Sequence, residues 1–345
     1  MRFSWSRFGL MAAASLAMGA GSVHATSVLD KVKERGVLHC GTDNAAPGFG
    51  FLNTQTGEME GLEVDLCRTV AAAVLGDASK VKYVVVTDKS RFTAVQTNQV
   101  DVVFARTTLK PGRESAITVD FLPIYFYDGT GVMVKDKAVS SVEELDGATL
   151  CTTQGSNTEQ TLAAYIKAKN WGGDTKVLTY ENLERLMSAL NSGRCVAIST
   201  DRSVLATLKS NAADPGQYDL LPEILNKSPF AGFTVVNDSR WRNALRWIIY
   251  ASYQAEEYEL TADALESARQ SPDPFIQKFL GINGSFGPDF GLPEDFVTQI
   301  IRQVGNFGEV YERNLGADSK TFIDRKDSLN EIWTRGGALY SPPWS

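Results

Sequence analysis

The chain is 345 residues long, 43% of them hydrophobic, and its formal net charge is −7 at pH 7. A negative charge of this size argues against a nucleic-acid-binding protein, because such proteins depend on a basic surface. The length and the apolar fraction are sufficient for two domains, each with a hydrophobic core of its own.

The first 25 residues have the pattern of a secretory signal peptide. Arg2 and Arg7 supply a basic start, residues 8–18 a short apolar core, and Val23-His24-Ala25 the small-residue cleavage pattern. No later stretch approaches the roughly 20 apolar residues that a membrane-spanning helix needs. We therefore expect export to the periplasm, with cleavage near Ala25.

Cysteine and histidine usage restricts the chemistry. The four cysteines would enter an oxidising compartment, so disulfide bonds are expected. Once His24 is lost with the signal peptide, His39, inside the apolar run VLHCGT, is the only histidine, which excludes metal sites with two or more histidines. A serine or cysteine nucleophile would depend on that one residue. Neither a GxxxxGK phosphate loop followed by Ser or Thr nor a GxGxxG motif is present, and we expect no metal and no cofactor.

The first half of the mature chain alternates strands and helices after a leader helix at 28–34. Apolar runs predict strands at 37–42, 81–87 and 100–105, and periodic apolar faces predict helices at 64–75 and 91–98. Such βαβαβ units form parallel strands with right-handed crossovers. We therefore expect an α/β fold with a doubly wound sheet.

The same alternation starts again after Val139. It predicts strands at 148–153, 176–180 and 195–200 and helices at 156–169 and 183–191. Two further runs, 129–134 and 230–236, are expected to cross between two lobes and form a hinge; helices should follow at 241–256 and 293–302. The expected division is 26–132 for the first part of lobe one, 133–231 for lobe two, and 232–345 for the second part of lobe one with a C-terminal extension.

Arg113 is the strongest candidate for a binding residue in the first lobe. It follows the last strand of that lobe in the segment TTLKPGR, in which Thr108 offers a hydroxyl and Pro111 can open a helical turn. Ligands of open α/β sheets bind beyond the carboxyl ends of the strands. A guanidinium suits a carboxylate there, because its donors can bind both oxygens at once. The alternative is a surface arginine paired with Glu114 or Asp120.

Two motifs of the second lobe offer complementary contacts. Ser156 and Glu159 have the spacing of a capping box at a helix start, where free N–H groups and the positive helix end favour an anion. Asp201 directly follows the strand at 195–200, so its carboxylate could bind an ammonium group. The alternatives are that Ser156 only caps its helix and that Asp201 only caps the helix beginning at Arg202.

In combination these motifs are those of a known family. The chain resembles the periplasmic solute-binding proteins of polar amino-acid ABC transporters, and among them the longer, general L-amino-acid-binding branch. The resemblance covers nearly the whole mature chain and is carried by the ordered segments VLDKVKERGVLHCGT, GLEVDLCRTVAAAVLGD, RFTAVQTNQVDVV, TTLKPGR, QGSNTEQ, NSGRCVAISTD, DLLPEI, QVGNFGEVYERNLG and RGGALYSPPW. It implies a two-lobed, type II periplasmic-binding-protein fold whose lobes close about the ligand like a Venus flytrap.

The resemblance also implies roles for individual residues. Arg113, helped by Thr108, is expected to bind the ligand carboxylate, and Asp201 to hold the α-ammonium group. The family's helix-start motif, usually Gly-Thr-Thr, is expected to help from the second lobe and corresponds here to Gly155, Ser156 and Asn157. The implied partners are an L-amino acid and an inner-membrane ABC transporter permease, and we expect a monomer that binds no nucleic acid.

The chain departs from the family pattern in the first-lobe loop DNAAPGFGF. Asp43 matches the acid often found there, Ala46 stands where an aromatic residue is expected, and Phe49 lies three residues on. Arg106 replaces a small hydroxyl residue that often helps to bind. Asp43, Phe49 and Arg106 are therefore our candidates for side-chain contacts, and we expect a broad profile of polar or charged L-amino acids. The open alternative is that Arg106 turns inward and selects acidic ligands.

The cysteines are expected to pair within each lobe. In a 2-1-3 strand order, Cys40 on a first strand lies beneath the helix that carries Cys67, and Cys151 and Cys195 lie on neighbouring strands. Bonds of this kind leave the hinge free to move.

Two other functions fit the same scaffold. Some exported proteins that resemble this family are enzymes, such as cyclohexadienyl dehydratase-like lyases, which need a general acid in the cleft; the spare carboxylates for that role are Asp43 and Asp201. A sensor domain would need a spanning helix or a signalling segment, and neither is apparent in this sequence.

Overall fold

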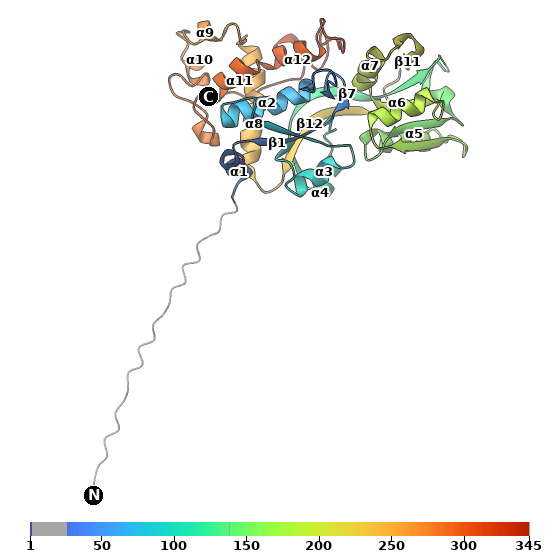
Figure 1. Ribbon diagram of the computed structural model, residues 1–345, viewed down its shortest axis with the longest axis horizontal. Helices are drawn as coiled ribbons and strands as arrows, with labels where there is room; N and C mark the ends of the chain where they lie inside the picture. The colour runs from blue at the N-terminus through green and yellow to red at the C-terminus, as the bar shows by residue number, and fades with distance from the viewer. Residues whose placement is uncertain (2–25, 138, 345) are drawn as a thin grey trace.

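The computed structural model describes Met1 and residues 26–137 and 139–344 of the chain. The predicted signal peptide, apart from Met1, lies outside these residues. Figure 1 shows two lobes side by side, with long strands running between them. No helix in the described part of the chain has the length and apolar character needed to cross a membrane.

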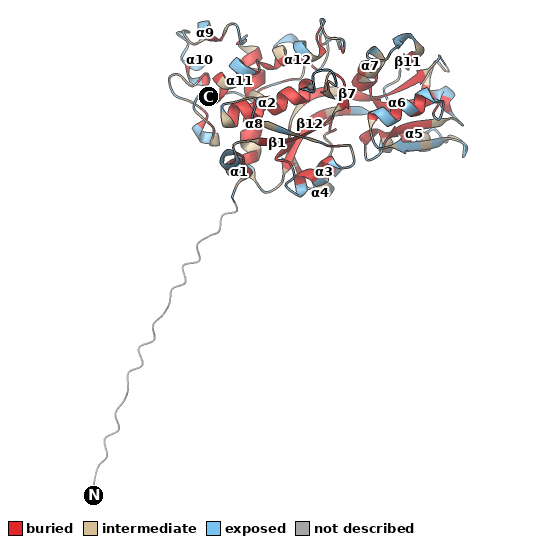
Figure 2. Cartoon of the chain, in the orientation of Figure 1, coloured by how far each residue is buried: buried red, intermediate tan, exposed pale blue. Residues whose placement is uncertain are grey.

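The first lobe has the predicted parallel sheet. β1 (Leu38–Thr42) lies between β5 (Val81–Val85) and β6 (Val102–Val103) and is parallel to both, which confirms the 2-1-3 order. Its helices are α1 (Val28–Arg35), α2 (Leu62–Leu75), α3 (Arg91–Gln96) and α4 (Pro111–Ile117). α2 is apolar along most of its length and is almost wholly buried, as the red ribbon in Figure 2 shows.

The segment between β1 and α2 is more ordered than the sequence indicates. The sequence pattern predicts only a loop and a turn, whereas the structure has a small antiparallel sheet of β2 (Ala45–Ala46), β3 (Gly50–Leu52) and β4 (Met59–Glu60). Strands of two or three residues are too short to show an alternating pattern. Gly61, with φ 125°, lets this sheet pack closely, because an added Cβ would lie 2.0 Å from the carbonyl oxygen of Phe49.

The second lobe repeats the arrangement. Its strands β8 (Thr149–Thr153), β9 (Lys176–Tyr180) and β10 (Ala197–Asp201) are parallel in the order β9-β8-β10. The last strand begins two residues later than predicted, at Ala197 rather than Cys195. The helices are α5 (Asn157–Ala168), α6 (Leu183–Asn191) and α7 (Arg202–Ser210), and β11 (Tyr218–Leu220) adds a further strand.

Two crossing strands connect the lobes, as predicted, and both differ in length from the predicted runs. β7 (Val119–Lys135) pairs with β12 (Lys227–Val235) from Val119 to Gly129 and then with β10 from Thr130 to Val134. Pro123 and Asp128 interrupt the apolar run of β7, so the sequence pattern does not predict the first half of this strand. The described strands outside the small sheet therefore form one nine-stranded sheet through both lobes.

Both predicted disulfide bonds are present. Cys40 is bonded to Cys67 with a Cα–Cα distance of 6.0 Å, and Cys151 to Cys195 with 5.9 Å. Each bond stays inside one lobe.

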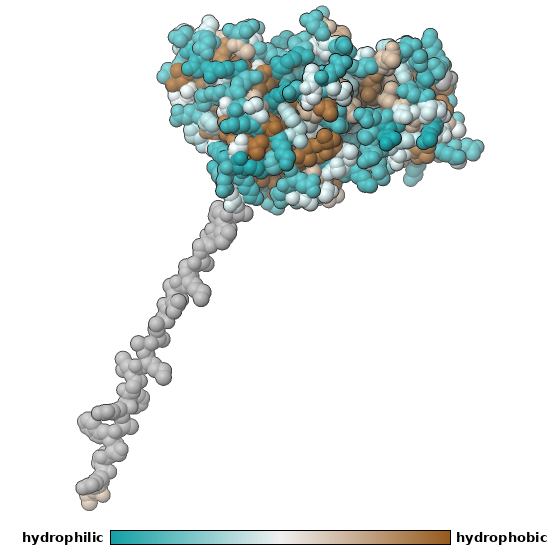
Figure 3. Space-filling model, in the orientation of Figure 1, coloured by the Kyte–Doolittle hydropathy of each residue, from teal (hydrophilic) through white to brown (hydrophobic). Residues whose placement is uncertain are grey.

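The rest of the chain returns to the first lobe. α8 (Ser239–Glu257) packs against α2, and α11 (Phe296–Gln303) starts three residues after Pro293, where the sequence predicts its first residue. The other helices are α9 (Leu265–Ala268), α10 (Pro274–Phe279), α12 (Phe307–Leu315) and short 3₁₀ turns at 142–145, 215–217, 288–290 and 333–335. Trp344 anchors the end of the chain, with its ring 4.8 Å from Trp247 and 5.2 Å from Phe279. Most of the face drawn in Figure 3 is hydrophilic.

A buried ion pair fastens the C-terminal extension to α8. Both carboxylate oxygens of Glu256 accept hydrogen bonds from Arg325, at 2.7 and 3.0 Å, and each side chain is 6% exposed. Arg325 also donates to the carbonyl of Asn330 at 2.6 Å. Glu256 also binds Arg335, which is about half exposed, so two arginines share this carboxylate.

We predict that Arg325→Ala lowers the free energy of unfolding by about 1.5 to 3 kcal/mol, because Glu256 would lose two charge-assisted hydrogen bonds and keep only the half-exposed Arg335 as a partner. Denaturant unfolding measures this change. The control is Arg240→Ala, which removes the exposed ion pair with Asp30 and should change stability by less than about 1 kcal/mol. Equal effects of the two substitutions would contradict a structural role for the buried pair.

Candidate functional site

Arg113 is a buried cation in the first turn of α4. Its side chain is 3% exposed, it donates to the carbonyl of Thr108 at 2.9 Å, and its guanidinium carbon lies 5.4 Å from the centre of the Phe92 ring. Burial and the nearby Arg91 lower the pKa of Arg113 to about 9, so it stays protonated at neutral pH.

The neighbouring arginines have acidic partners, whereas Arg113 does not. Arg91 pairs with Asp88 at 2.7 Å, and Arg106 pairs with Asp43. Among the described residues no carboxylate lies within ion-pair distance of Arg113. The alternative of a surface arginine paired with Glu114 or Asp120 is therefore not what the structure shows, since Asp120 instead lies 3.6 Å from Arg242.

A chain of hydroxyl groups links this region to the second lobe. Asp201 is 7% exposed, and its carboxylate accepts a hydrogen bond from the Ser228 hydroxyl at 2.7 Å. The Thr108 and Ser228 hydroxyl oxygens are 2.8 Å apart. Because the single Ser228 proton goes to Asp201, Thr108 must be the donor in that contact. In this arrangement Thr108 can assist a ligand carboxylate only through its backbone N–H.

Asp201 is at the N-cap position of α7, but its side chain does not cap the helix. Burial raises the pKa of Asp201 to about 6. The ionised carboxylate is thus held in a site that favours its neutral form, as is expected where an ammonium partner is to be supplied from outside.

The start of α5 lies against the first lobe. Ser156 caps α5 by accepting from the Glu159 N–H at 3.0 Å, and Glu159 accepts from the N–H of Gly155 at 2.7 Å, one residue before the position used in a capping box. Gly155 has φ 77°, and an added Cβ would lie 3.1 Å from the Cα of Lys89. The predicted helix-start residues therefore lie at the contact between the lobes.

Side chains cross this contact at two further points. Lys110 donates to the Asn157 side-chain oxygen at 3.0 Å, and Thr153 donates to Asp88 at 2.7 Å. The Asn157 side-chain nitrogen is buried and has no partner among the described residues. The lobes are thus in contact on the Arg113 side of the crossing strands.

Arg106 turns inward and is paired with an acid. It is 4% exposed, its backbone has φ 44°, and its backbone N–H contacts the buried Glu63 carboxylate and the Tyr125 hydroxyl, the latter at 3.1 Å. Its guanidinium binds Asp43, which also accepts from the N–H groups of Asn44 and Ala45 at 2.7 and 2.8 Å. The Arg106 Nε is buried with no partner among the described residues.

Phe49 lies in the core of the first lobe. It has no exposed surface and makes edge-to-face contacts with Phe126 at 5.2 Å and Phe230 at 6.0 Å. Ala46 is equally buried. In this conformation neither residue presents a surface to a ligand, so Phe49 is not placed as the predicted side-chain contact would require.

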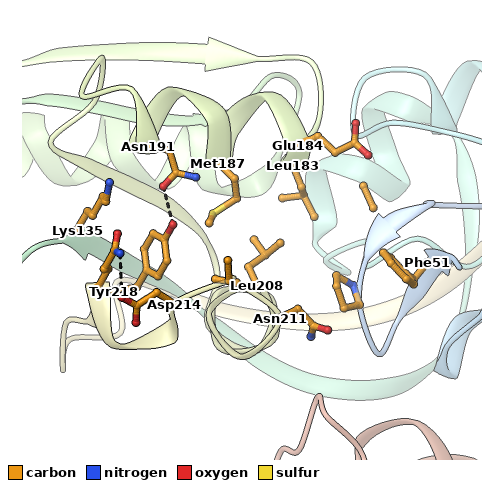
Figure 4. Close-up of a pocket in the computed structure, with 15 residues that line it drawn as sticks. Phe51, Lys135, Leu183, Glu184, Met187, Asn191, Leu208, Asn211, Asp214 and Tyr218 are labelled. Carbon is orange, nitrogen blue, oxygen red and sulfur yellow. Dashed lines mark hydrogen bonds between the residues drawn. The ribbon is translucent and has the colours of Figure 1, made fainter. Parts of the chain in front are cut away.

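Two cavities lie between the lobes. One, of about 420 Å³, is lined by Asp88, Lys110 and Arg113 from the first lobe and by Gly155 and Gln160 from the second. The other, of about 510 Å³, lies between the small sheet and α6 and α7. Ala45 is among its lining residues, and Phe51 lies across it from Leu183, Met187 and Leu208 (Figure 4). Its lining includes none of the predicted site residues, so we base the site on the first cavity and on the polar chain beside it.

Sequence reasoning missed four polar residues of this region: Asp88, Arg91, Asp128 and Ser228. Asp88 and Arg91 follow β5, so the rule that strand ends carry binding residues could have found them. Ser228 and Asp128 lie on the crossing strands, where only the register brings them to Asp201. Among the described residues no group of three or more His, Cys, Asp and Glu side chains is arranged to hold a metal ion.

We predict that Asp201→Asn stabilises the ligand-free protein at pH 7.5, by on the order of 1 to 3 kcal/mol, since the folded state holds Asp201 ionised above its raised pKa. The amide oxygen can still accept from Ser228. Because the unfolded carboxyl titrates near pH 4, the difference should shrink as the pH falls through 6 towards 4. Denaturant unfolding at pH 7.5 and 5 measures it, with the exposed Asp263→Asn as control. A variant that is less stable than the wild type at pH 7.5 would contradict this account.

Comparison with known proteins gives the family. The bacterial extracellular solute-binding proteins, family 3, match residues 38–270. The general L-amino acid-binding periplasmic protein AapJ of Rhizobium johnstonii is 39% identical over 334 residues, 96% of each chain. The glutamate/glutamine/aspartate/asparagine-binding protein BztA of Rhodobacter capsulatus is 40% identical over 339 residues, 98% of each chain.

A solved structure agrees with these relatives. An ABC transporter/periplasmic binding protein from Brucella ovis with glutathione bound is 38% identical and matches with a TM-score of 0.87, covering 92% of this chain and 99% of that chain. The predicted type II binding-protein fold is thereby confirmed. The chain belongs to the bacterial extracellular solute-binding proteins of family 3.

Proposed function

We propose that this protein is the periplasmic amino-acid-binding component of an ABC transporter, and that it binds the ligand between its lobes. One observation carries the proposal. A buried guanidinium without an acidic partner, Arg113, is joined through Thr108 and Ser228 to a buried carboxylate from the other lobe, Asp201. The two charges are the complement of a free amino acid, which carries one carboxylate and one ammonium group.

The neighbouring arginines support this assignment, because each is paired with an acid and so does not need a ligand. Arg91 is neutralised by Asp88 and Arg106 by Asp43. Burying a charge is costly unless it is paired, so Arg113 and Asp201 are the groups that gain most from a ligand. The relatives AapJ and BztA are both named as amino-acid-binding proteins.

The contacts between the lobes are those of a closed cleft. Gly155, Asn157 and Thr153 of the second lobe meet Lys89, Lys110 and Asp88 of the first. A ligand that bridges Arg113 and Asp201 would favour this state over an open one. The predicted lobe boundaries, after residues 132 and 231, fall within β7 and β12 and stay a prediction, as does closure.

Localisation and partners follow from the family. Its proteins are extracellular or periplasmic. One relative is named as an amino-acid ABC transporter-binding protein, which implies an ABC transporter as the partner. Cleavage near Ala25, a monomeric state, the lack of nucleic-acid binding and the identity of the inner-membrane permease remain predictions.

The chain is a solute-binding protein rather than an enzyme, because its relatives are solute-binding proteins. Of the two carboxylates that a lyase could use, Asp43 is engaged by Arg106. A structure described as an ancestral amino acid-binding protein and precursor of cyclohexadienyl dehydratase is more distant, at 25% identity and a TM-score of 0.57.

A small peptide is a second candidate ligand. The Brucella ovis structure has glutathione bound, and this chain has the cavity of about 510 Å³ that begins at Ala45, two residues from Asp43. That cavity offers room between the lobes for groups beyond a single amino acid (Figure 4). Glutathione keeps one free amino-acid end that Arg113 and Asp201 could bind.

We predict that Arg113→Ala weakens amino-acid binding ten- to a hundredfold, because a charge-assisted hydrogen bond contributes about 1.5 to 3 kcal/mol. Calorimetry with L-glutamine and L-glutamate measures the loss. Arg240→Ala, on the outer surface, should bind as the wild type does. Unchanged affinity in Arg113→Ala would remove this site assignment.

We further predict a broad selectivity, because Arg106 and Asp43 neutralise each other, so neither selects a charged ligand side chain. Several polar or charged L-amino acids should bind within about tenfold, a spread of roughly 1.4 kcal/mol. A thermal-shift panel of the common L-amino acids and glutathione tests this. Stabilisation by one compound alone, or by aspartate and glutamate alone, would show the broad profile to be wrong, and Arg106→Ala would then test whether Arg106 selects acidic ligands.

A further inference from the structure

Helix α7 begins in an unusual way. Asp201 occupies its N-cap position, with φ −62° and ψ 138°, but makes no capping hydrogen bond. Asp residues at this position normally accept from the second or third N–H of the helix, which otherwise lacks a partner. The Asp201 carboxylate instead accepts from Ser228 on β12.

Another strand supplies the cap. The Asp128 carboxylate, on β7, accepts from the Ser203 N–H at 3.1 Å and from the Ser203 hydroxyl. Ser203 is the second residue of α7, so Asp128 binds the N–H that an N-cap side chain would bind. Asp128 also accepts from the N–H of Gly129 at 2.7 Å, which fixes the carboxylate on its own strand.

The strand register explains this arrangement. Asp201 lies opposite Thr130 in the antiparallel pairing of β10 with β7, so continuing the register brings Ser203 opposite Asp128. On the other side of β7, Asp128 lies opposite Ser228. Asp128 is therefore between the helix start of the second lobe and the serine that binds Asp201.

We propose that Asp128 is a positioning residue for the ammonium site: it caps α7 in place of Asp201 and so leaves the Asp201 carboxylate free for the ligand. This inference rests on the proposed function. Without Asp128, the free N–H of Ser203 would attract the next available carboxylate, which is that of Asp201 at the helix start. Asp201 would then turn towards the helix and away from the ligand.

The charge of Asp128 also acts on its neighbour. Burial and Asp201 raise the pKa of Asp128 to about 7, and burial raises that of Asp201 to about 6. Among the charged groups around Asp201, Arg106 and Arg91 lower its pKa and Asp88 raises it. Two neighbouring buried carboxylates disfavour each other's ionisation, and Asp201, which has the lower pKa, ionises while Asp128 is still largely protonated.

The experiment compares two substitutions at one position. Asp128→Ala removes the cap, and Asp128→Asn keeps an acceptor oxygen for Ser203 but removes the charge. At pH 7.5 we expect calorimetry with L-glutamine to show a loss of affinity of tenfold or more in Asp128→Ala and a change within about threefold in Asp128→Asn. The matched control is Asn182→Ala, which removes the cap of α6 in the same lobe, where Asn182 accepts from the Arg185 N–H at 3.0 Å, and should leave the affinity unchanged.

The pH profile separates positioning from general stability. L-glutamine has no side chain that titrates between pH 5 and 8, so the fall in its affinity on acidification reports protonation of the site. In Asp128→Ala, where Asp201 would accept from the free N–H of Ser203, we expect the carboxyl carbon of Asp201 to titrate at lower pH by NMR in the ligand-free protein, because hydrogen bonds to the charged form lower the pKa of a carboxyl group. In Asp128→Asn, which keeps the cap, we expect no comparable shift. Asp128→Ser also lacks the capping carboxylate and is the second variant if Asp128→Ala does not fold.

The outcomes distinguish the two proposals. A wild type that binds no amino acid would overturn the proposed function. A wild type that binds, with wild-type affinity or an unshifted Asp201 titration in Asp128→Ala or in Asp128→Ser, would overturn the role of Asp128 alone.

Discussion

The antiparallel pairing of β7 with β12 is the constraint on which the site depends. Both strands run from one lobe into the other, and their register sets Ser228 opposite Asp128. Ser228 then reaches Thr108 of the first lobe and Asp201 of the second. A shift of one residue would turn every side chain of β12 to the other face of the sheet and break this connection. The strands predicted to form the hinge therefore also carry part of the proposed binding site.

In the ligand-free protein, the proposed site buries charged groups at a cost in free energy. Arg113 is buried without an acidic partner, and Asp201 and Asp128 are buried carboxylates whose pKa values are raised to about 6 and 7. Residues optimised for stability alone would not be arranged in this way. The nearby pairs Arg91–Asp88 and Arg106–Asp43 show that the same region can neutralise charges. Of the groups left over, Arg113 and Asp201 match the two charges that all free amino acids share.

The sequence predicted the features that depend on local patterns or on short-range topology. The parallel 2-1-3 order of each lobe and both disulfide bonds follow from the alternation of strands and helices. Arg113 and Asp201 could be proposed as binding residues because each follows a strand at its carboxyl end, and their roles stay a prediction. The partners of Asp201 were not predictable, because Asp128 and Ser228 reach it through the register of strands that are distant in sequence. Phe49 was predicted to contact the ligand but is buried against Phe126, for a related reason. The sequence does not show whether an aromatic residue in a loop points to the cleft or to the core.

The central claim is that Arg113 and Asp201 bind the two charged groups of a free amino acid. Blocking each ligand group in turn tests it most directly, because the protein is left unchanged. In calorimetry, L-glutamine should bind, whereas its N-acetyl derivative, which lacks the ammonium group, and its α-amide, which lacks the carboxylate, should each bind at least tenfold more weakly. Binding of either blocked derivative as tightly as L-glutamine itself would contradict the account.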